Sequence, residues 1–200
     1  MYRKFLLATL TAAALALTAP AMASATDVPD LPTGVDQAYL ADGNGDPQNG
    51  TLDLTGQLVL SGALTVTCDY DVSIDYFDDG TTAVTQFAAS NCAVTSFPSC
   101  VVSITATNLD WGDRFGFNTS TDEYEDHINV AFNVTLGAGC PVSGTFAHHG
   151  RWWPKLRITG FFIELVWTFG GSGSVTSPLG TATTSGTLTG SIPSGYQLIH

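Results

Sequence analysis

Four oxygen-bearing side chains lie close together in the stretch DGNGDPQNGTLD (residues 42–53): Asp42, Asn44, Asp46 and Asp53. Calcium prefers carboxylate and amide oxygens, and this spacing follows the first, third, fifth and twelfth positions of a helix-flanked calcium loop. Pro47 stands at the sixth position, where that loop needs a glycine with a positive φ. The stretch therefore predicts either a loose calcium-binding turn or an ordinary turn of Asx and Gly residues.

Two further segments concentrate acidic residues. In DYDVSIDYFDD (residues 69–79), the side chains of Asp69, Asp71, Ser73 and Asp75 share one face of a predicted strand. Such carboxylates either share a cation or form a solvated outer face that discourages edge pairing. The segment TSTDEYEDH (residues 119–127) groups Asp122, Glu123, Glu125, Asp126 and His127. It predicts either a binding loop for an ion or substrate, or a surface loop.

The segment HHGRWWPKLR (residues 148–157) combines basic and aromatic side chains. Paired tryptophans on a β scaffold can stack on sugar rings, and nearby cations suit an anionic glycan or a membrane interface. We predict ligand contacts from Arg151, Trp152, Trp153 and Lys155. The alternative is a hairpin with a basic tip followed by a buried strand. His148 and His149 point to opposite faces of a strand, so regular geometry does not let them chelate one ion together.

A resemblance to an enzyme family covers seven residues. FFIELVW (residues 161–167) resembles the nucleophile strand of a family of jelly-roll endoglucanases. The resemblance implies that Glu164 is a nucleophile in a cleft lined by Trp152, Trp153 and Trp167. Those enzymes supply the acid/base carboxylate downstream, whereas no Asp or Glu follows Glu164 here. A retaining pair, about 5.5 Å apart, would need an upstream partner, Glu123 or Glu125.

The first 25 residues have the pattern of a secretory signal peptide. Arg3 and Lys4 precede an uncharged apolar run from Phe5 to Thr18, and small residues allow cleavage after Ala23 or Ala25. About 14 apolar residues are too few to span a bilayer. The sequence therefore predicts a secreted, extracellular or cell-surface protein.

The charge of the mature chain limits its partners. Removing the signal leaves four basic and 18 acidic residues, a net charge of −14. Such a surface repels phosphate backbones and anionic lipid headgroups, so we expect no nucleic-acid partner. The sequence also does not favour an integral membrane protein, because an outer-membrane barrel would need a repeated amphipathic pattern of about ten residues and an aromatic terminal strand. Extracellular glycans and surface proteins remain as partners.

Cys68, Cys92, Cys100 and Cys140 form an even set in an oxidising compartment, which predicts two disulfides. A turn at residues 77–81 brings Cys68 opposite Cys92, and a loop near Ser120 brings Cys100 opposite Cys140. We favour these two pairings, although a turn at residues 95–98 would instead allow Cys92 to reach Cys100. The sequence contains no Cys-x-x-Cys pair, so a zinc site is less expected than two disulfides.

Strict alternation of apolar and polar residues dominates the mature chain. Even positions from Leu52 to Tyr76 are mostly apolar, and a break near Gly56 or Ser61–Gly62 must divide so long a run. About nine or ten strands follow, so we predict an all-β fold: an antiparallel sandwich (jelly-roll or Ig-like) or a closed barrel with two disulfides. The domains are the signal peptide (1–25), an extended Pro/Gly/Asp-rich lead-in (26–50) and one β domain (51–200).

No catalytic motif of the G-x-S-x-G, phosphate-loop or H-E-x-x-H type is present. We therefore expect a non-catalytic binding module for a glycan or protein ligand, without a cofactor unless calcium binds. The alternative is a carbohydrate-active hydrolase that uses Glu164. The N-x-[ST] sequons at Asn49, Asn118 and Asn133 would be used only in a glycosylating host.

Overall fold

The computed structural model describes residues 28–200 except 110 and 160–163. Its described residues form thirteen strands and no helix. The strands are β1 (Val35–Gln37), β2 (Tyr39–Asp42), β3 (Gly50–Ser61), β4 (Thr65–Tyr76), β5 (Thr81–Val94), β6 (Val102–Ala106), β7 (Trp111–Asn118), β8 (Glu123–Leu136), β9 (Gly144–Trp152), β10 (Lys155–Thr159), β11 (Glu164–Ser177), β12 (Gly180–Ser191) and β13 (Tyr196–Ile199).

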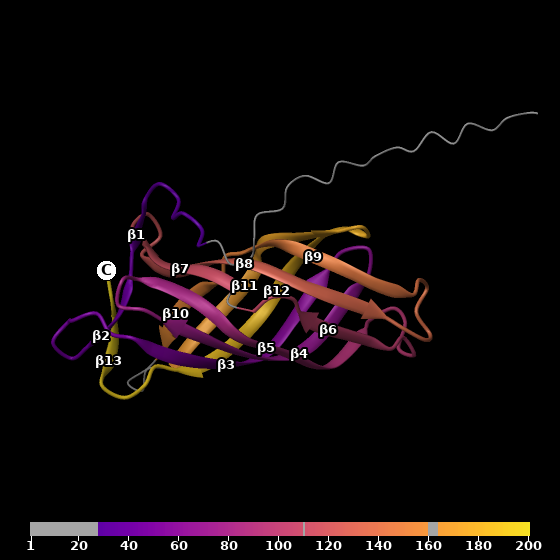
Figure 1. The fold of residues 1–200 in the computed structure, drawn as a ribbon, viewed down its shortest axis with the longest axis horizontal. Coiled ribbons are helices and arrows are strands. Elements are labelled where there is room, and N and C mark those ends of the chain that lie inside the picture. The colour runs from indigo at the N-terminus through magenta and orange to yellow at the C-terminus, as the bar shows by residue number, and fades with distance from the viewer. Residues whose placement is uncertain (1–27, 110, 160–163) are drawn as a thin grey trace, which may run out of the picture.

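Eleven of these strands form one antiparallel sheet that closes into a barrel with eight strand positions (Figure 1). Neighbours around the barrel are neighbours in sequence, from β3 through β12, and β12 pairs back with β3. Two positions hold two short strands each. β6 and β7 lie between β5 and β8, and β9 and β10 lie between β8 and β11. The chain is thus an up-and-down barrel, the closed alternative of the predicted all-β fold, and not a sandwich.

The alternation of residues 52–76 separates the inside of the barrel from its outside. Even positions such as Leu52, Leu54 and Ile74 are buried, while most odd positions carry polar side chains toward solvent. The long run is divided at Ser61–Gly62, one of the two expected breaks, by a turn in which the Gly62 N–H donates to the Leu64 carbonyl. Because the turn preserves the phase, β3 and β4 both present their apolar side chains inward.

Aromatic side chains fill the middle of the barrel. Trp152 packs with its ring centroid 5.9 Å from Phe87, 5.8 Å from Phe132 and 5.5 Å from Phe169. Trp111 meets the same cluster, 6.3 Å from Trp152 in an edge-to-face arrangement. Rings from five strand positions therefore meet at one level, which makes this cluster the centre of the core.

One end of the barrel is covered by the strands outside the meander. β2 and β13 form a separate two-stranded sheet, and β1 extends the main sheet beside β7 (Figure 1). Ala38 and Leu40 are buried, and the Gln37 amide donates to the Phe115 carbonyl at 2.8 Å. Residues 28–50, expected as an extended lead-in, thus contribute two strands to the domain because their few apolar side chains cover the barrel end. We call this the capped end.

The opposite end, the open end, carries both disulfides. Cys68 of β4 is bonded to Cys92 of β5, and Cys100 before β6 is bonded to Cys140 after β8. Both favoured pairings are confirmed, and Cys92 does not fold back onto Cys100. Each bridge joins neighbouring parts of the barrel wall, so the bridges hold together an end that no extra strand of the described residues covers.

Trp152 and Trp153 provide a paired test of this packing. Trp152 is 3% exposed in the core, whereas Trp153 is 43% exposed on the outside. We expect Trp152→Ala to lower the free energy of unfolding by about 3–5 kcal/mol, because it leaves a cavity. Trp153→Ala should change it by less than about 1 kcal/mol. Urea denaturation followed by circular dichroism measures both, and equal losses would contradict the inward and outward assignment.

The bridge between Cys100 and Cys140 gives a second test. It closes a segment of 40 residues, and we expect the double variant Cys100→Ser/Cys140→Ser to lose about 2–4 kcal/mol of unfolding free energy. The same denaturation assay checks the loss, with thiol titration of the unfolded wild type confirming that no free sulfhydryl is present. An unchanged midpoint would show that the bridge does not restrain the unfolded chain.

Candidate functional site

A groove of about 520 Å³ lies on the outer surface where β9 pairs with β11. Its size falls within the range of about 300–1,000 Å³ that is typical of small-ligand sites. The groove is lined by His149, Gly150, Arg151, Trp153, Gly171, Gly173, Ser174, Thr176 and Thr183. The groove therefore contains the exposed Trp153 ring, the Arg151 guanidinium and the hydroxyl groups of Ser174, Thr176 and Thr183.

Two breaks in regular pairing shape this groove. Pro154, which has no backbone N–H, separates β9 from β10, and Trp153 lies outward beside it. Across from it, the register of β11 shifts between Gly170 and Ser174, where Gly171 and Gly173 have φ of 74° and 86°. A Cβ at Gly173 would lie 2.1 Å from the Arg151 carbonyl oxygen. Glycine is therefore required for this close approach, and it leaves the groove without side chains at those positions.

The predicted ligand-binding residues separate into three environments. Arg151 and Trp153 line the groove, while Trp152 lies in the core. The Lys155 ammonium is paired with the Glu123 carboxylate beside the groove. No described acidic side chain forms an ion pair with Arg151. The two tryptophans therefore do not form one surface, because consecutive strand residues point to opposite faces.

A buried hydrogen-bonded pair adjoins Trp153. His127 Nε2 lies 2.9 Å from Glu125 Oε1, and the His127 ring centroid lies 6.1 Å from that of Trp153. Both partners are at most 9% exposed, although they sit at outward positions of β8. One prediction for the acidic segment 122–127 was a surface loop. In the structure, β8 begins within this segment, at Glu123. The His127 ring of this pair therefore lies next to the Trp153 ring.

The hydrolase alternative depends on Glu164, whose side chain lies outside the described part of the structure. Its backbone begins β11 and pairs with Thr159 and Ser191. Glu125 lies level with Lys155 and Thr168, four residues along β11 from Glu164. Four residues correspond to about 13 Å along a strand, so the register separates the backbones of Glu125 and Glu164.

The predicted calcium turn is organised by its own hydrogen bonds. The Asp42 carboxylate accepts the N–H groups of Asn44 at 2.8 Å and Asp46 at 3.1 Å, and these bonds hold the pKa of Asp42 below its usual value. Asp53 lies on the outer face of β3 and accepts from the Ser73 hydroxyl at 2.6 Å. Among the described residues, no group of three or more His, Cys, Asp or Glu side chains is placed to hold a metal ion. The hydrogen bonds within the turn therefore engage the Asp42 carboxylate directly.

The acidic face of β4 is solvated and hydrogen-bonded across strands. The Asp69 carboxylate accepts from Asn91 at 2.9 Å and from Gln57 at 3.2 Å, which lowers the pKa of Asp69. Thr51 donates to Asp75 at 2.7 Å. These contacts are those of an outer barrel surface.

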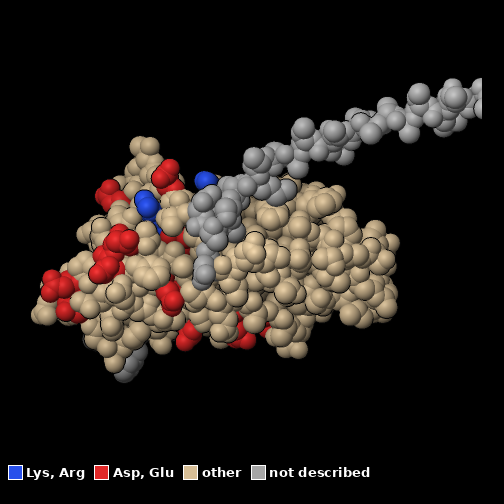
Figure 2. Space-filling model, in the orientation of Figure 1, with Lys and Arg blue, Asp and Glu red and all other residues tan. Residues whose placement is uncertain are grey.

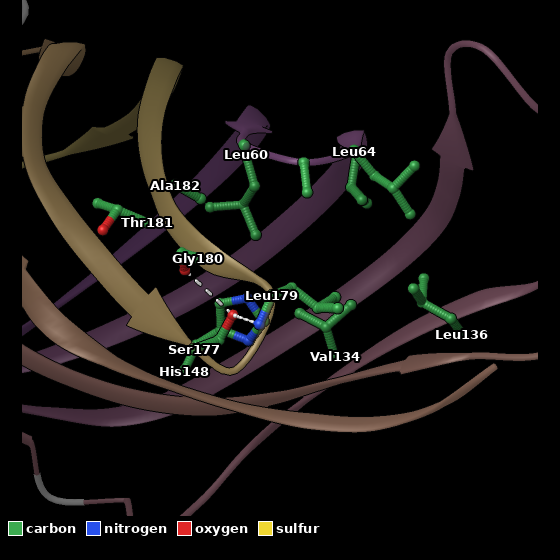
Figure 3. A pocket seen from close by; sticks show the side chains of 13 residues that line it. Leu60, Leu64, Val134, Leu136, His148, Ser177, Leu179, Gly180, Thr181 and Ala182 are labelled. Carbon is green, nitrogen blue, oxygen red and sulfur yellow. Dashed lines mark hydrogen bonds between the residues drawn. The ribbon is translucent and has the colours of Figure 1, made fainter. Parts of the chain in front are cut away.

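A smaller pocket of about 40 Å³ lies at the open end (Figure 3). Apolar side chains from β3, β8 and the β11–β12 turn converge there, including Leu60, Val134 and Leu179, and His148 also lines the space. His148 Nδ1 lies 2.9 Å from the Phe146 carbonyl, and its ring stacks on Phe132. This volume holds one or two water molecules but not a typical organic ligand.

The interior near the capped end contains two fully buried carboxyl groups, Asp113 and Asp126. Burial raises the pKa of Asp113 to about 7, and burial followed by the charge of Asp113 raises that of Asp126 well above its usual value. Sequence reasoning grouped Asp126 with a surface segment and did not single out Asp113. The available signal was the alternation that places Asp113 in phase with Trp111 and Phe115 on β7.

Comparisons with protein-family models, curated proteins and solved structures found no match to this chain. In addition, no helix among the described residues is long and apolar enough to cross a membrane. The function must therefore be argued from the geometry of the described sites.

The environment of His148 predicts a pH dependence of stability. Burial lowers the pKa of His148, and the hydrogen bond with Phe146 offsets part of this effect. Since the unfolded chain takes up the proton first, near pH 6.5, unfolding should become easier as the pH falls below that value. We expect His148→Asn to lack this component when denaturation midpoints are compared between pH 7.5 and pH 5. His149→Asn is the matched control, and an identical slope in wild type and His148→Asn would contradict the assignment.

Proposed function

We propose that this protein is a non-catalytic binding module of the extracellular space or cell surface, and that its ligand is a glycan held in the outer groove. The observation that carries the proposal is the position of Trp153. Its ring is 43% exposed at the edge of a groove otherwise lined by Gly, Ser, Thr, His and Arg residues. An exposed indole beside hydroxyls suits a sugar ring, because the ring faces stack while the sugar hydroxyls find polar partners.

The charge distribution supports an acidic sugar. Asp and Glu side chains gather toward the capped end, while the opposite end shows none on the face drawn in Figure 2. Arg151 lies exposed in the groove, and no described carboxylate pairs with it. A guanidinium can bind a carboxylate through two parallel hydrogen bonds. A uronate or another carboxylated sugar therefore fits this groove better than a nucleic acid, which the overall negative charge of the chain would repel.

The predicted compartment agrees with this proposal. Two disulfides are consistent with an oxidising environment, and the signal peptide predicted over residues 1–25 lies outside the described residues. A secreted or surface-exposed module meets extracellular glycans. A protein ligand is the alternative for the same groove.

Binding is favoured over hydrolysis by the arrangement of carboxylates. Glu123 is tied to Lys155, Glu125 is tied to His127, and the register keeps Glu125 far from Glu164. The hydrolase alternative makes a simple opposing claim. If it were correct, the wild type would release reducing sugar and Glu164→Gln would abolish that release.

The test measures binding of neutral and uronate-containing oligosaccharides by glycan array and then by calorimetry. We expect Trp153→Ala to weaken binding at least about tenfold, which corresponds to the loss of a stacking contact. Arg151→Gln should weaken binding of the acidic sugars selectively. Both variants should keep the wild-type free energy of unfolding within about 1 kcal/mol.

Phe77→Ala is the matched control, because Phe77 is 41% exposed on a turn of the capped end, away from the groove. Its binding should equal that of the wild type. If the Trp153→Ala variant binds glycans normally, the groove is not the site. If no glycan binds and a surface protein does, the glycan assignment is overturned and the protein alternative takes its place.

A further inference from the structure

The two buried carboxyl groups of the interior belong to a larger cluster of oxygen atoms. Tyr76 of β4, Thr82 of β5, Asp113 of β7 and Asp126 of β8 all occupy inward positions near the capped end and are at most 2% exposed. They come from four consecutive positions of the barrel wall. The pairing of β4 with β5, of β5 with β7 and of β7 with β8 brings them together.

The strand register places these side chains at one level. Tyr76 pairs directly with Thr82, and Thr82 pairs directly with Asp113. Asp126 pairs with Phe115, two residues along β7 from Asp113. Direct partners on one face have Cβ atoms about 5 Å apart and diagonal neighbours about 7 Å apart. The four side chains are thus within reach of one common point.

Most of the oxygens in this cluster lack a hydrogen-bond partner. Neither carboxylate oxygen of Asp113, nor Oδ1 of Asp126, nor the Thr82 hydroxyl has one. The Tyr76 hydroxyl donates only a long bond, 3.5 Å, to Asp126 Oδ2. The Thr82 hydroxyl and the backbone N–H groups of Arg114 and His127 lie near enough to favour the ionised form of Asp113, but none meets the geometry of a hydrogen bond. Buried polar atoms are nearly always satisfied in proteins, so these atoms require a partner.

No protein cation is available to them. None of the described Lys and Arg residues is among the buried ones. Arg114 next to Asp113 has a buried Nε atom but occupies the outward-facing phase of β7. Two carboxylates without a counter-charge are costly in so apolar an interior. A bound cation would supply the missing counter-charge, and it would coordinate several of the unpartnered oxygens at once.

We propose that Tyr76, Thr82, Asp113 and Asp126 form an internal calcium site that ties four strand positions of the barrel together. Two bidentate carboxylates and two hydroxyls offer up to about six oxygens, the lower limit of calcium coordination. The two negative charges match a divalent ion. Magnesium demands near-ideal octahedral geometry and keeps several waters, for which the surrounding Trp111, Phe115 and Ile128 side chains leave no polar partners. This site differs from the turn at residues 42–46 and does not depend on the glycan proposal.

Wild-type protein is sufficient for the first test. The full mature chain is purified without chelator, and its calcium content is measured by plasma mass spectrometry; we expect about one ion per chain. Thermal denaturation is then recorded after exhaustive EDTA treatment and after addition of calcium chloride, which should raise the midpoint. Terbium, which replaces calcium, should show luminescence excited through the nearby Trp111 and Tyr76. Absence of bound metal together with equal midpoints would overturn the proposal, because a shared proton or water would then satisfy the cluster.

Variants locate the site. Asp113→Asn and Asp126→Asn should each lose the bound calcium and the calcium-dependent rise in midpoint, with their β structure checked by circular dichroism. Asp53→Asn on the outer face and Asp42→Asn in the turn are the matched controls and should retain both. If Asp42→Asn loses the ion while Asp113→Asn keeps it, the turn is the site and the internal assignment is wrong. If the interior variants do not fold, the calcium content of the wild type and its denaturation midpoints with EDTA and with calcium test the proposal without them.

Discussion

The pairing of β12 with β3 is the interaction on which the rest of the structure depends. These strands lie at opposite ends of the meander, and their ladder runs from Thr183 opposite Ser61 to Gly190 opposite Leu54. Without it the sheet would have two long unpaired edges. With it, every inward side chain faces other inward side chains across a closed interior. Gly56 and Gly186 permit this ladder, since a Cβ at either would lie within 2.3 Å of a carbonyl oxygen on the partner strand.

Closure fixes which side chains are available to solvent. Trp152 and Trp153 are neighbours of the same residue type. Trp152 lies in the core and Trp153 on the surface, because consecutive side chains of the barrel wall point alternately inward and outward. The irregular positions of the wall then determine where a ligand can bind. The outer groove forms where Pro154 interrupts β9–β10 and where glycines shift the register of β11.

The pairing of neighbouring strands also concentrates polar groups that no single hairpin would bring together. The inward oxygens of β4, β5, β7 and β8 meet only because β7 bridges β5 and β8 at the capped end. The cap itself is built from segments more than 150 residues apart, β2 and β13. The two barrel ends consequently differ. One is covered by β2 and β13 and carries many acidic residues, whereas the other is held by two disulfides and contains a small apolar pocket.

The sequence alone determined the all-β class and the inward face of β3 and β4, because period-two alternation is a local property. Hairpin geometry favoured the two observed disulfide pairings over one alternative, and the pattern offered Ser61–Gly62 as one of two possible breaks. It also singled out Arg151 and Trp153, since their composition contrasts with the rest of the chain. It did not distinguish a barrel from a sandwich, because that depends on whether β12 reaches β3. The separation of the Glu164 and Glu125 backbones and the meeting of Asp113 with Asp126 in the interior were likewise decided by tertiary structure. The physical reason is that register and closure, which set distances between strands far apart in sequence, leave no mark on the local pattern.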